Sequence, residues 1–235
     1  MKMLLTSNGF LDISLEKYFL DLVGDRKNLR VAIIPNASDP IEWVPEKEGD
    51  PVSAYVAKLT RPNDVDYGKG KDYDYFISKG YEVAIADLKE DPMEVKKKLE
   101  SADIIDVWGG DGNWLLDWAK KAKLDTYLKD ILDRGTVYVG ASAGSCLLTP
   151  DIGLGWWTPE WNLDHVGLGI VDFIISPHNK EVELSANIEK TNKLREQMQS
   201  HISYPWKIYF LQDGQAIKID GDKIEHVGPG TKTCI

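Results

Sequence analysis

Short apolar runs rich in β-branched residues alternate along this chain with longer stretches whose apolar residues recur at helical spacing. The runs are typical of strands buried on both faces, and they cover residues 1–7, 30–36, 81–87, 103–110 and 136–142. The helical stretches between them include Leu11 to Val23, Pro92 to Leu99 and Trp114 to Leu132. Because strands that alternate with helices form βαβ units, we expect an α/β fold with a mostly parallel sheet and helices on both faces.

Length and charge limit the organisation and the partners. A chain of 235 residues with 43% hydrophobic content can bury one large core, so we expect a single α/β domain over residues 1–235. The formal net charge of −10 argues against nucleic acid or an anionic membrane, because phosphate binding needs clustered Lys and Arg. No stretch has the length of a signal-peptide apolar region or a membrane span. We expect a cytosolic protein whose partner is small or peptidic.

Two regions differ from the βα alternation. Residues 39–75 are rich in Pro, Asp, Glu and Lys and predict a polar excursion, part of which, roughly Val52 to Leu59, is expected to be helical. We favour a variable surface insertion over a substrate lid for this excursion. Towards the C-terminus, Glu181 to Gln199 predicts a helix, and two later apolar runs around Asp220-Gly221-Asp222 predict a C-terminal β-hairpin.

The segment Gly140-Ala141-Ser142-Ala143-Gly144 fits the GxSxG pattern directly after a predicted buried strand. A sharp strand-to-helix turn lifts the serine hydroxyl above the sheet edge, and small neighbours are needed because the backbone folds back on itself. The Ala143 amide in the following helix is placed to bind a developing oxyanion. Small residues also pack βα turns that carry no chemistry, so the pattern alone is a moderate signal. Ser142 is the predicted nucleophile.

A serine nucleophile needs a base, and a third group that orients the base. His178 is our first choice because it follows an apolar strand that ends at Ser176-Pro177, whereas His165, in a predicted loop, is the second. Ser145 and Cys146 are rival nucleophiles, but both fall inside the predicted helix and more often pack or cap there.

A second glycine turn, Gly109-Gly110-Asp111-Gly112, also lies between a predicted strand and a helix. Glycine lets backbone amides approach a ligand, so Gly110 is a candidate second oxyanion donor. The turn fits neither the GxGxxG nor the P-loop pattern, which makes a phosphate site the weaker interpretation. The two cysteines and four histidines lack the spacing of metal ligands, so we expect no metal and no cofactor.

In this order the motifs resemble the peptidase E (S51) family of serine dipeptidases, whose fold is similar to that of class I glutamine amidotransferases. The resemblance rests on segments spread over most of the chain: MKMLLTSNGF, Ile33 to Ala37, Gly109-Gly110 with Leu115-Leu116, Gly140 to Ser145, Ser176-Pro177-His178 and Gly214 to Ile217. It implies Ser142 as nucleophile, His178 as base, and Gly110 with Ala143 as oxyanion donors.

The resemblance leaves the acidic member of the triad open. The family places it in the loop between serine and histidine, which offers Asp151, Glu160 and Asp164; Glu160 fits the family spacing best. Asp213 is also a candidate, because its position resembles the one at which the related cyanophycinases have an acidic residue. Asp111 replaces the asparagine that is usual after the two glycines, and its charge would repel an aspartyl substrate. Trp157 is a candidate wall of the substrate pocket.

Together these features predict a serine peptidase that hydrolyses small peptides, in the manner of a dipeptidase, through an acyl-enzyme on Ser142. Two alternatives stay open: a cyanophycinase-like hydrolase of β-linked or isoaspartyl peptides, and a non-catalytic binding module that retains the fold. The partner we expect is a small peptide substrate. A homodimer is an open alternative, because the sequence does not determine the oligomeric state.

Overall fold

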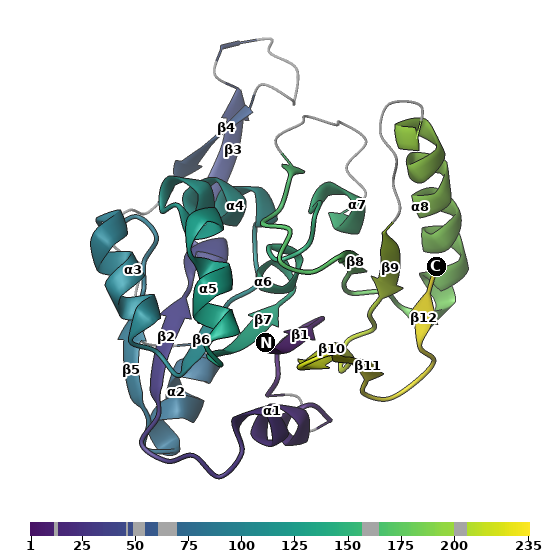
Figure 1. Ribbon diagram of the computed structural model, residues 1–235. Coiled ribbons are helices and arrows are strands. Elements are labelled where there is room, and N and C mark those ends of the chain that lie inside the picture. The colour runs from purple at the N-terminus through teal and green to yellow at the C-terminus, as the bar shows by residue number, and fades with distance from the viewer. Residues whose placement is uncertain (12–13, 46, 49–54, 61–69, 157–164, 200–205) are drawn as a thin grey trace.

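A seven-stranded sheet forms the centre of the protein (Figure 1). The computed structural model describes residues 1–11, 14–45, 47–48, 55–60, 70–156, 165–199 and 206–235. The strand order is β11-β10-β1-β7-β6-β2-β5. Strands β1, β7, β6, β2 and β5 are parallel to one another, whereas β10 and β11 are antiparallel to their neighbours. The sheet therefore confirms the predicted mostly parallel α/β class.

The strands of this sheet are β1 (Lys2–Thr6), β2 (Arg30–Ile34), β5 (Glu82–Ile85), β6 (Ile104–Val107), β7 (Val137–Ala141), β10 (Ala216–Asp220) and β11 (Lys223–Val227). A second sheet, ordered β12-β9-β8, contains β8 (Phe173–Ser176), β9 (Lys207–Phe210) and β12 (Thr233–Cys234), and a two-stranded sheet contains β3 (Ile41–Pro45) and β4 (Tyr55–Leu59). The helices are α1 (Glu16–Val23), α2 (Lys71–Ser78), α3 (Pro92–Glu100), α4 (Gly112–Lys121), α5 (Leu128–Asp133), α6 (Ala143–Cys146), α7 (Gly153–Trp156) and α8 (Leu184–Gln199). Short 3₁₀ turns span Asn36–Ser38, Leu124–Thr126 and Glu181–Glu183.

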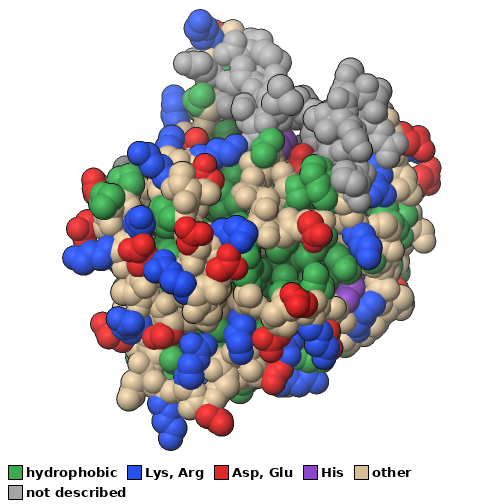
Figure 2. Space-filling view, in the orientation of Figure 1, with side chains coloured by type: hydrophobic (Ala, Val, Ile, Leu, Met, Phe, Trp, Pro, Cys, Tyr) green, Lys and Arg blue, Asp and Glu red, His purple; other side chains and the backbone are tan. Residues whose placement is uncertain are grey.

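Helices cover both faces of the central sheet. Alternate strand residues enter two separate cores: Met3 and Leu5 of β1 pack with residues of α3, α4, α5 and α6, whereas Leu4 packs with residues of α1 and α2. Figure 2 shows acidic and basic side chains interspersed over the face that carries α4 and α5. Within the described residues, no helix combines the length and apolarity that crossing a bilayer requires.

Several predicted boundaries were wrong. The helix expected over roughly Val52 to Leu59 is wrong where it can be compared, because Tyr55–Leu59 forms strand β4 and pairs antiparallel with β3. Residues 52–54 lie outside the described part of the chain. The single long helix expected from Trp114 to Leu132 divides into α4 and α5, since Lys123 between them has a left-handed φ of 58°. Helix α2 at Lys71–Ser78 was not predicted. The C-terminal hairpin of β10 and β11 is confirmed, with Gly221 at φ 61° in its turn.

The pairing register places four strand ends at one edge of the sheet. Thr6 of β1 pairs with Ala141 of β7, and Val107 of β6 pairs with both Gly140 and Ile34. The loops that follow β1, β2, β6 and β7 therefore emerge side by side. In open α/β sheets, the carboxyl ends of the strands are where ligands bind.

Candidate active site

Ser142 occupies the turn between β7 and α6 at this edge. Its backbone φ of 50° is a conformation that residues other than glycine seldom adopt. A Cβ added at Gly144 would lie 2.2 Å from the carbonyl oxygen of Val107, so α6 can approach β6 only because this position is glycine. A Cβ at Gly140 would lie 2.7 Å from the amide nitrogen of Ser145. The glycines of the GxSxG pattern are thus required by close backbone packing around a strained serine.

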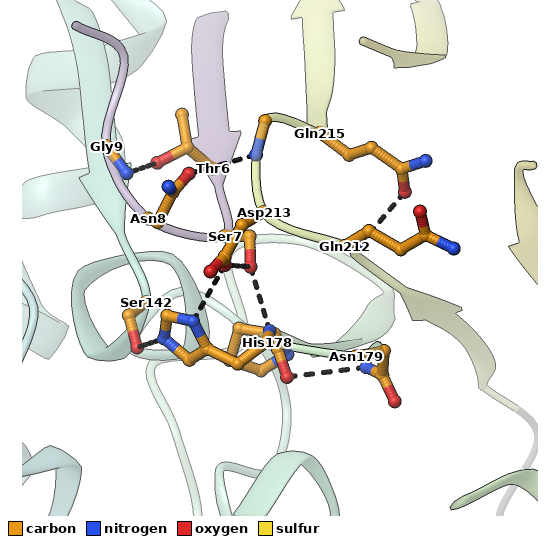
Figure 3. A network of polar contacts seen from close by, with 12 residues as sticks. Thr6, Ser7, Asn8, Gly9, Ser142, His178, Asn179, Gln212, Asp213 and Gln215 are labelled. Carbon is orange, nitrogen blue, oxygen red and sulfur yellow. Dashed lines mark hydrogen bonds and ion pairs between the residues drawn. The ribbon is translucent and has the colours of Figure 1, made fainter. Parts of the chain in front are cut away.

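His178 lies two residues beyond β8 and directs its imidazole at Ser142 (Figure 3). The distance between His178 Nε2 and Ser142 Oγ is 2.8 Å. His178 also has a positive φ, 58°, and its turn is held by Asn179, whose Nδ2 donates to the carbonyl oxygen of Ser176 at 2.7 Å. The predicted nucleophile and the predicted base, 36 residues apart in sequence, are therefore within hydrogen-bonding distance.

Asp213, in the loop between β9 and β10, is the acidic partner of His178. Its Oδ1 atom lies 2.9 Å from His178 Nδ1. A carboxylate only accepts hydrogen bonds, so Nδ1 carries the proton and the Nε2 lone pair accepts from the Ser142 hydroxyl. Glu160 and Asp164 lie outside the described residues. Among the acidic candidates that the structure describes, Asp151 accepts from the backbone amides of Gly153 and Leu154, and Asp213 contacts the histidine.

The exposure of the three side chains differs. Ser142 is 6% exposed, whereas the side chains of His178 and Asp213 are 45% and 58% exposed. Solvent screens the attraction between an imidazolium and a carboxylate at such exposure. The contact of Asp213 with His178 consequently acts more through the orientation and tautomer of the imidazole than through its Coulomb energy.

The rival nucleophiles are both buried in structural contacts. The Ser145 hydroxyl lies 2.8 Å from the carbonyl oxygens of both Thr6 and Gly140. The Cys146 thiol lies 3.5 Å from the carbonyl oxygen of Ile175, and burial raises its pKa to about 12. Because a thiolate is the nucleophilic form of cysteine, this pKa makes Cys146 inert at neutral pH.

The other histidines lie elsewhere. His226, on β11, contacts Gln215 Oε1 at 3.1 Å, and burial lowers its pKa to about 4. His165, the second choice for the base, lies beyond α7, where its Nδ1 would be 2.7 Å from a Cβ added at Gly153. His201 is outside the described residues. Within the part of the chain that the structure describes, no group of three or more His, Cys, Asp or Glu side chains could hold a metal ion.

The glycine turn after β6 packs directly on Ser142. A Cβ at Gly109 would lie 3.1 Å from Ser142 Cβ. Gly110 has φ 140°, and a Cβ there would lie 2.0 Å from the carbonyl oxygen of Ala37, so both its conformation and its surroundings require glycine. Ser38 supports the same turn by donating its hydroxyl to the Gly109 carbonyl at 2.6 Å. These contacts hold the turn beside Ser142, the predicted nucleophile, where its amides can face a reacting group.

Asp111 has two contacts that the sequence did not indicate. Its Oδ1 accepts from the Trp114 amide at 2.8 Å and so caps the N-terminus of α4. Its Oδ2 accepts from Trp43 Nε1 at 2.7 Å, which ties the hairpin of β3 and β4 to the glycine turn. The carboxylate predicted to repel an acidic substrate is thus partly satisfied by the protein itself. Trp157, the other predicted pocket residue, lies outside the described residues.

Sequence reasoning missed Ser7. This residue follows β1 and is fully buried, and its hydroxyl contacts both Asp213 and the backbone of His178. Its only sequence signal is a polar residue directly after a buried strand, at the edge where parallel strands end. That signal is shared by many residues without a role in chemistry.

A hydroxyl, an imidazole and a carboxylate in hydrogen-bonded series, beside a strained strand-to-helix turn of a parallel sheet, define the site of a serine hydrolase. Residues 3–227 match the model of peptidase family S51. The chain belongs to this family of serine peptidases.

Individual relatives agree with the family. The chain is 25% identical to an uncharacterized peptidase of Pasteurella multocida over 184 residues, which are 76% of this chain and 77% of the relative. It is 27% identical to a peptidase E of a Nostoc species over 155 residues, 65% of this chain and 62% of the relative.

Two solved structures share the fold. A peptidase E candidate from Listeria monocytogenes superposes with a TM-score of 0.65 at 24% identity and covers 97% of this chain and 98% of its own. A peptidase from an acI-B1 Actinobacterium superposes with a TM-score of 0.62 at 16% identity, covering 100% and 93% respectively. At these identities the two superpositions show the fold alone.

Proposed function

We propose that this serine peptidase hydrolyses small peptides, in the manner of a dipeptidase, through an acyl-enzyme on Ser142. The observation that carries the proposal is the series Asp213, His178 and Ser142, with distances of 2.9 Å and 2.8 Å between successive members. In this series His178 Nε2 takes the hydroxyl proton as Ser142 Oγ attacks the peptide carbonyl. His178 then returns the proton to the leaving amine, and water releases the acyl group by the reverse sequence.

The developing oxyanion is assigned to two backbone amides, those of Ala143 and Gly110. Ala143 is the first residue of α6, where helix amides have no partner within the helix, and Gly110 belongs to the turn that packs on Ser142. Donors that are already in place before reaction contribute most to such stabilisation. The glycine-dependent packing of both segments supports this assignment.

A cyanophycinase-like hydrolysis of β-linked or isoaspartyl peptides is the second candidate. It is favoured by the position of the acid: Asp213 follows β9, where the resemblance places the acidic residue of the cyanophycinases, rather than in the loop before His178. The catalytic steps are the same in both cases. Only the bond presented to Ser142 differs.

The test is a panel of matched α-linked and β-linked dipeptides, assayed with the unaltered protein and with Ser142→Ala. We expect hydrolysis of α-linked dipeptides by the unaltered protein and none by the variant, whose circular dichroism should be unchanged. Hydrolysis confined to β-linked substrates would establish the second candidate instead. A folded protein that cleaves no peptide and forms no Ser142 adduct with a fluorophosphonate would point to a binding module.

A further inference from the structure

The hydroxyl of Ser7 contacts two members of the proposed triad at once (Figure 3). Ser7 Oγ donates to Asp213 Oδ1 at 2.9 Å, the same oxygen that lies 2.9 Å from His178 Nδ1. The same hydroxyl oxygen accepts from the backbone N–H of His178 at 2.8 Å. Ser7 itself is fully buried, so its hydroxyl has no contact with bulk solvent.

The topology explains why such a link is needed. His178 and Asp213 are in loops that follow β8 and β9 of the three-stranded sheet, whereas Ser142 follows β7 of the central sheet. Ser7 follows β1, which pairs directly with β7. The hydrogen bonds of its hydroxyl therefore connect the base and the acid to the same sheet that carries the nucleophile.

Neighbouring contacts hold the Asp213 loop against the end of β1. The Ser7 amide donates to the carbonyl oxygen of Gln215 at 3.0 Å, and Asn8 Oδ1 accepts from the Gly214 amide at 3.1 Å. The backbone of the loop is thus fixed independently of the Ser7 hydroxyl. Removing that hydroxyl should free the Asp213 side chain without releasing its loop.

We propose that Ser7 is a positioning residue of this active site: its hydroxyl holds the Asp213 carboxylate on His178 Nδ1 and supports the left-handed backbone of His178. The inference rests on the proposed function. With its side chain 58% exposed, Asp213 turns towards water once the Ser7 donor is lost. The imidazole then loses the acceptor on Nδ1 that fixes its tautomer, and the tautomer whose Nε2 lone pair faces Ser142 becomes less populated.

The first measurement is kcat and KM for Ser7→Ala with the best substrate of the dipeptide panel. We expect kcat/KM to fall about 10-fold to 100-fold, in the range that misplaced catalytic groups show, with the loss in kcat rather than in KM. If the alanine variant does not fold, Ser7→Cys is the second variant, because a thiol is a weaker donor of similar size and should lower kcat by less.

The matched control is Ser145→Ala. It also removes a buried hydroxyl near the end of β1, since Ser145 Oγ lies 2.8 Å from the Thr6 carbonyl oxygen, but it contacts neither His178 nor Asp213 in the bonds described. We expect its kcat to change much less than that of Ser7→Ala. An unchanged kcat in folded Ser7→Ala, or an equal loss of kcat in Ser145→Ala, overturns the inference.

NMR measurement of the histidine ring ¹⁵N chemical shifts, which report the nitrogen that carries the proton, separates this inference from the proposed function, because it needs no turnover. It compares Ser142→Ala with the double variant Ser7→Ala/Ser142→Ala, and the His178 signals are assigned from their loss in His178→Gln. We expect a smaller share of the Nδ1-protonated tautomer of His178 in the double variant. If the unaltered protein is inactive but the spectra show this change, the proposed function fails and the positioning role of Ser7 stands. If the protein is active and the spectra show no change, Ser7 is not a positioning residue.

Discussion

Replacing Asp72 with asparagine should stabilise the protein at neutral pH and leave its stability unchanged at pH 4. Asp72 lies in the first turn of α2, whose N-cap residue Gly70 packs against Trp108, the residue after β6: a Cβ added at Gly70 would lie 2.3 Å from Cη2 of Trp108. Burial raises the pKa of Asp72 to about 6. Asp106 of β6 is also buried, and burial together with the nearby charge of Asp72 raises its pKa well above the usual range. Two carboxyl groups are thus held in a region that disfavours their ionisation.

The sign follows from proton linkage. Between the unfolded pKa near 3.9 and the folded pKa of about 6, the folded state holds a proton on Asp72 that the unfolded state has released, so stability falls as pH rises through this window. A shift of roughly two pH units at about 1.4 kcal/mol each gives a loss of about 3 kcal/mol above pH 6. Asparagine has the shape of the protonated carboxyl and carries no such penalty. The variant should therefore be more stable than the unaltered protein by about 3 kcal/mol at pH 7.5 and by about zero at pH 4.

Urea unfolding at four pH values between 4 and 7.5 measures the difference. His226, whose pKa burial lowers to about 4, changes stability in the opposite direction over about pH 4 to 6.5, but it is present in both proteins and cancels. Asp74→Asn is the matched control, because Asp74 belongs to the same first turn of α2 and is exposed. A stability gain that is absent at pH 7.5, or equal at every pH, would refute the reasoning.

Three further predictions concern the site and its support. Asp213→Asn should lower kcat/KM by about 10⁴-fold through loss of the required tautomer, whereas Glu160→Gln should have a much smaller effect; steady-state assays compare them, and the reverse order would return the acidic role to Glu160. Gly144→Ala should lower the free energy of unfolding by about 1–3 kcal/mol or more, because its Cβ meets the Val107 carbonyl at 2.2 Å, and a urea midpoint equal to that of the unaltered protein would contradict this. Cys146 should react with a thiol reagent only after unfolding, as mass spectrometry of the labelled peptide would show, and rapid labelling of the native protein would be inconsistent with its burial.

Local features of the site could be predicted, because they depend on residues adjacent in sequence. The turn at Ser142 needs small neighbours on both sides, and those neighbours appear directly in the GxSxG pattern. Asp213 could not be chosen over Glu160 in this way, because its place is set by long-range pairing. Leu211 donates its amide to the Ser176 carbonyl at 2.8 Å, and this contact between β8 and β9 brings the loop of Asp213 beside the turn of His178. No pattern within either segment encodes that contact.

The errors in secondary structure have the same origin. The stretch around Tyr55–Leu59 has apolar residues that suit a helix or a strand, and its pairing with Ile41–Pro45 decides between them. The helix at Lys71–Ser78 is polar along most of its exposed side, and it is anchored by Phe76, which packs at 5.6 Å from the ring of Phe10. In both cases a tertiary contact outweighs a weak local preference.

Two residues that the proposed mechanism uses have an unusual backbone conformation. Among the described residues other than glycine, only four have positive φ, and two of these are Ser142 and His178. Such conformations cost about 1–3 kcal/mol each and persist only where surrounding contacts determine them. For Ser142 the contact is the hydrogen bond that its backbone N–H donates to the Thr6 carbonyl oxygen at 3.0 Å. For His178 it is the hydrogen bond that its backbone N–H donates to the Ser7 hydroxyl oxygen at 2.8 Å. Both anchors lie at the end of β1, so this strand end, which carries no proposed catalytic group, determines how nucleophile and base face each other.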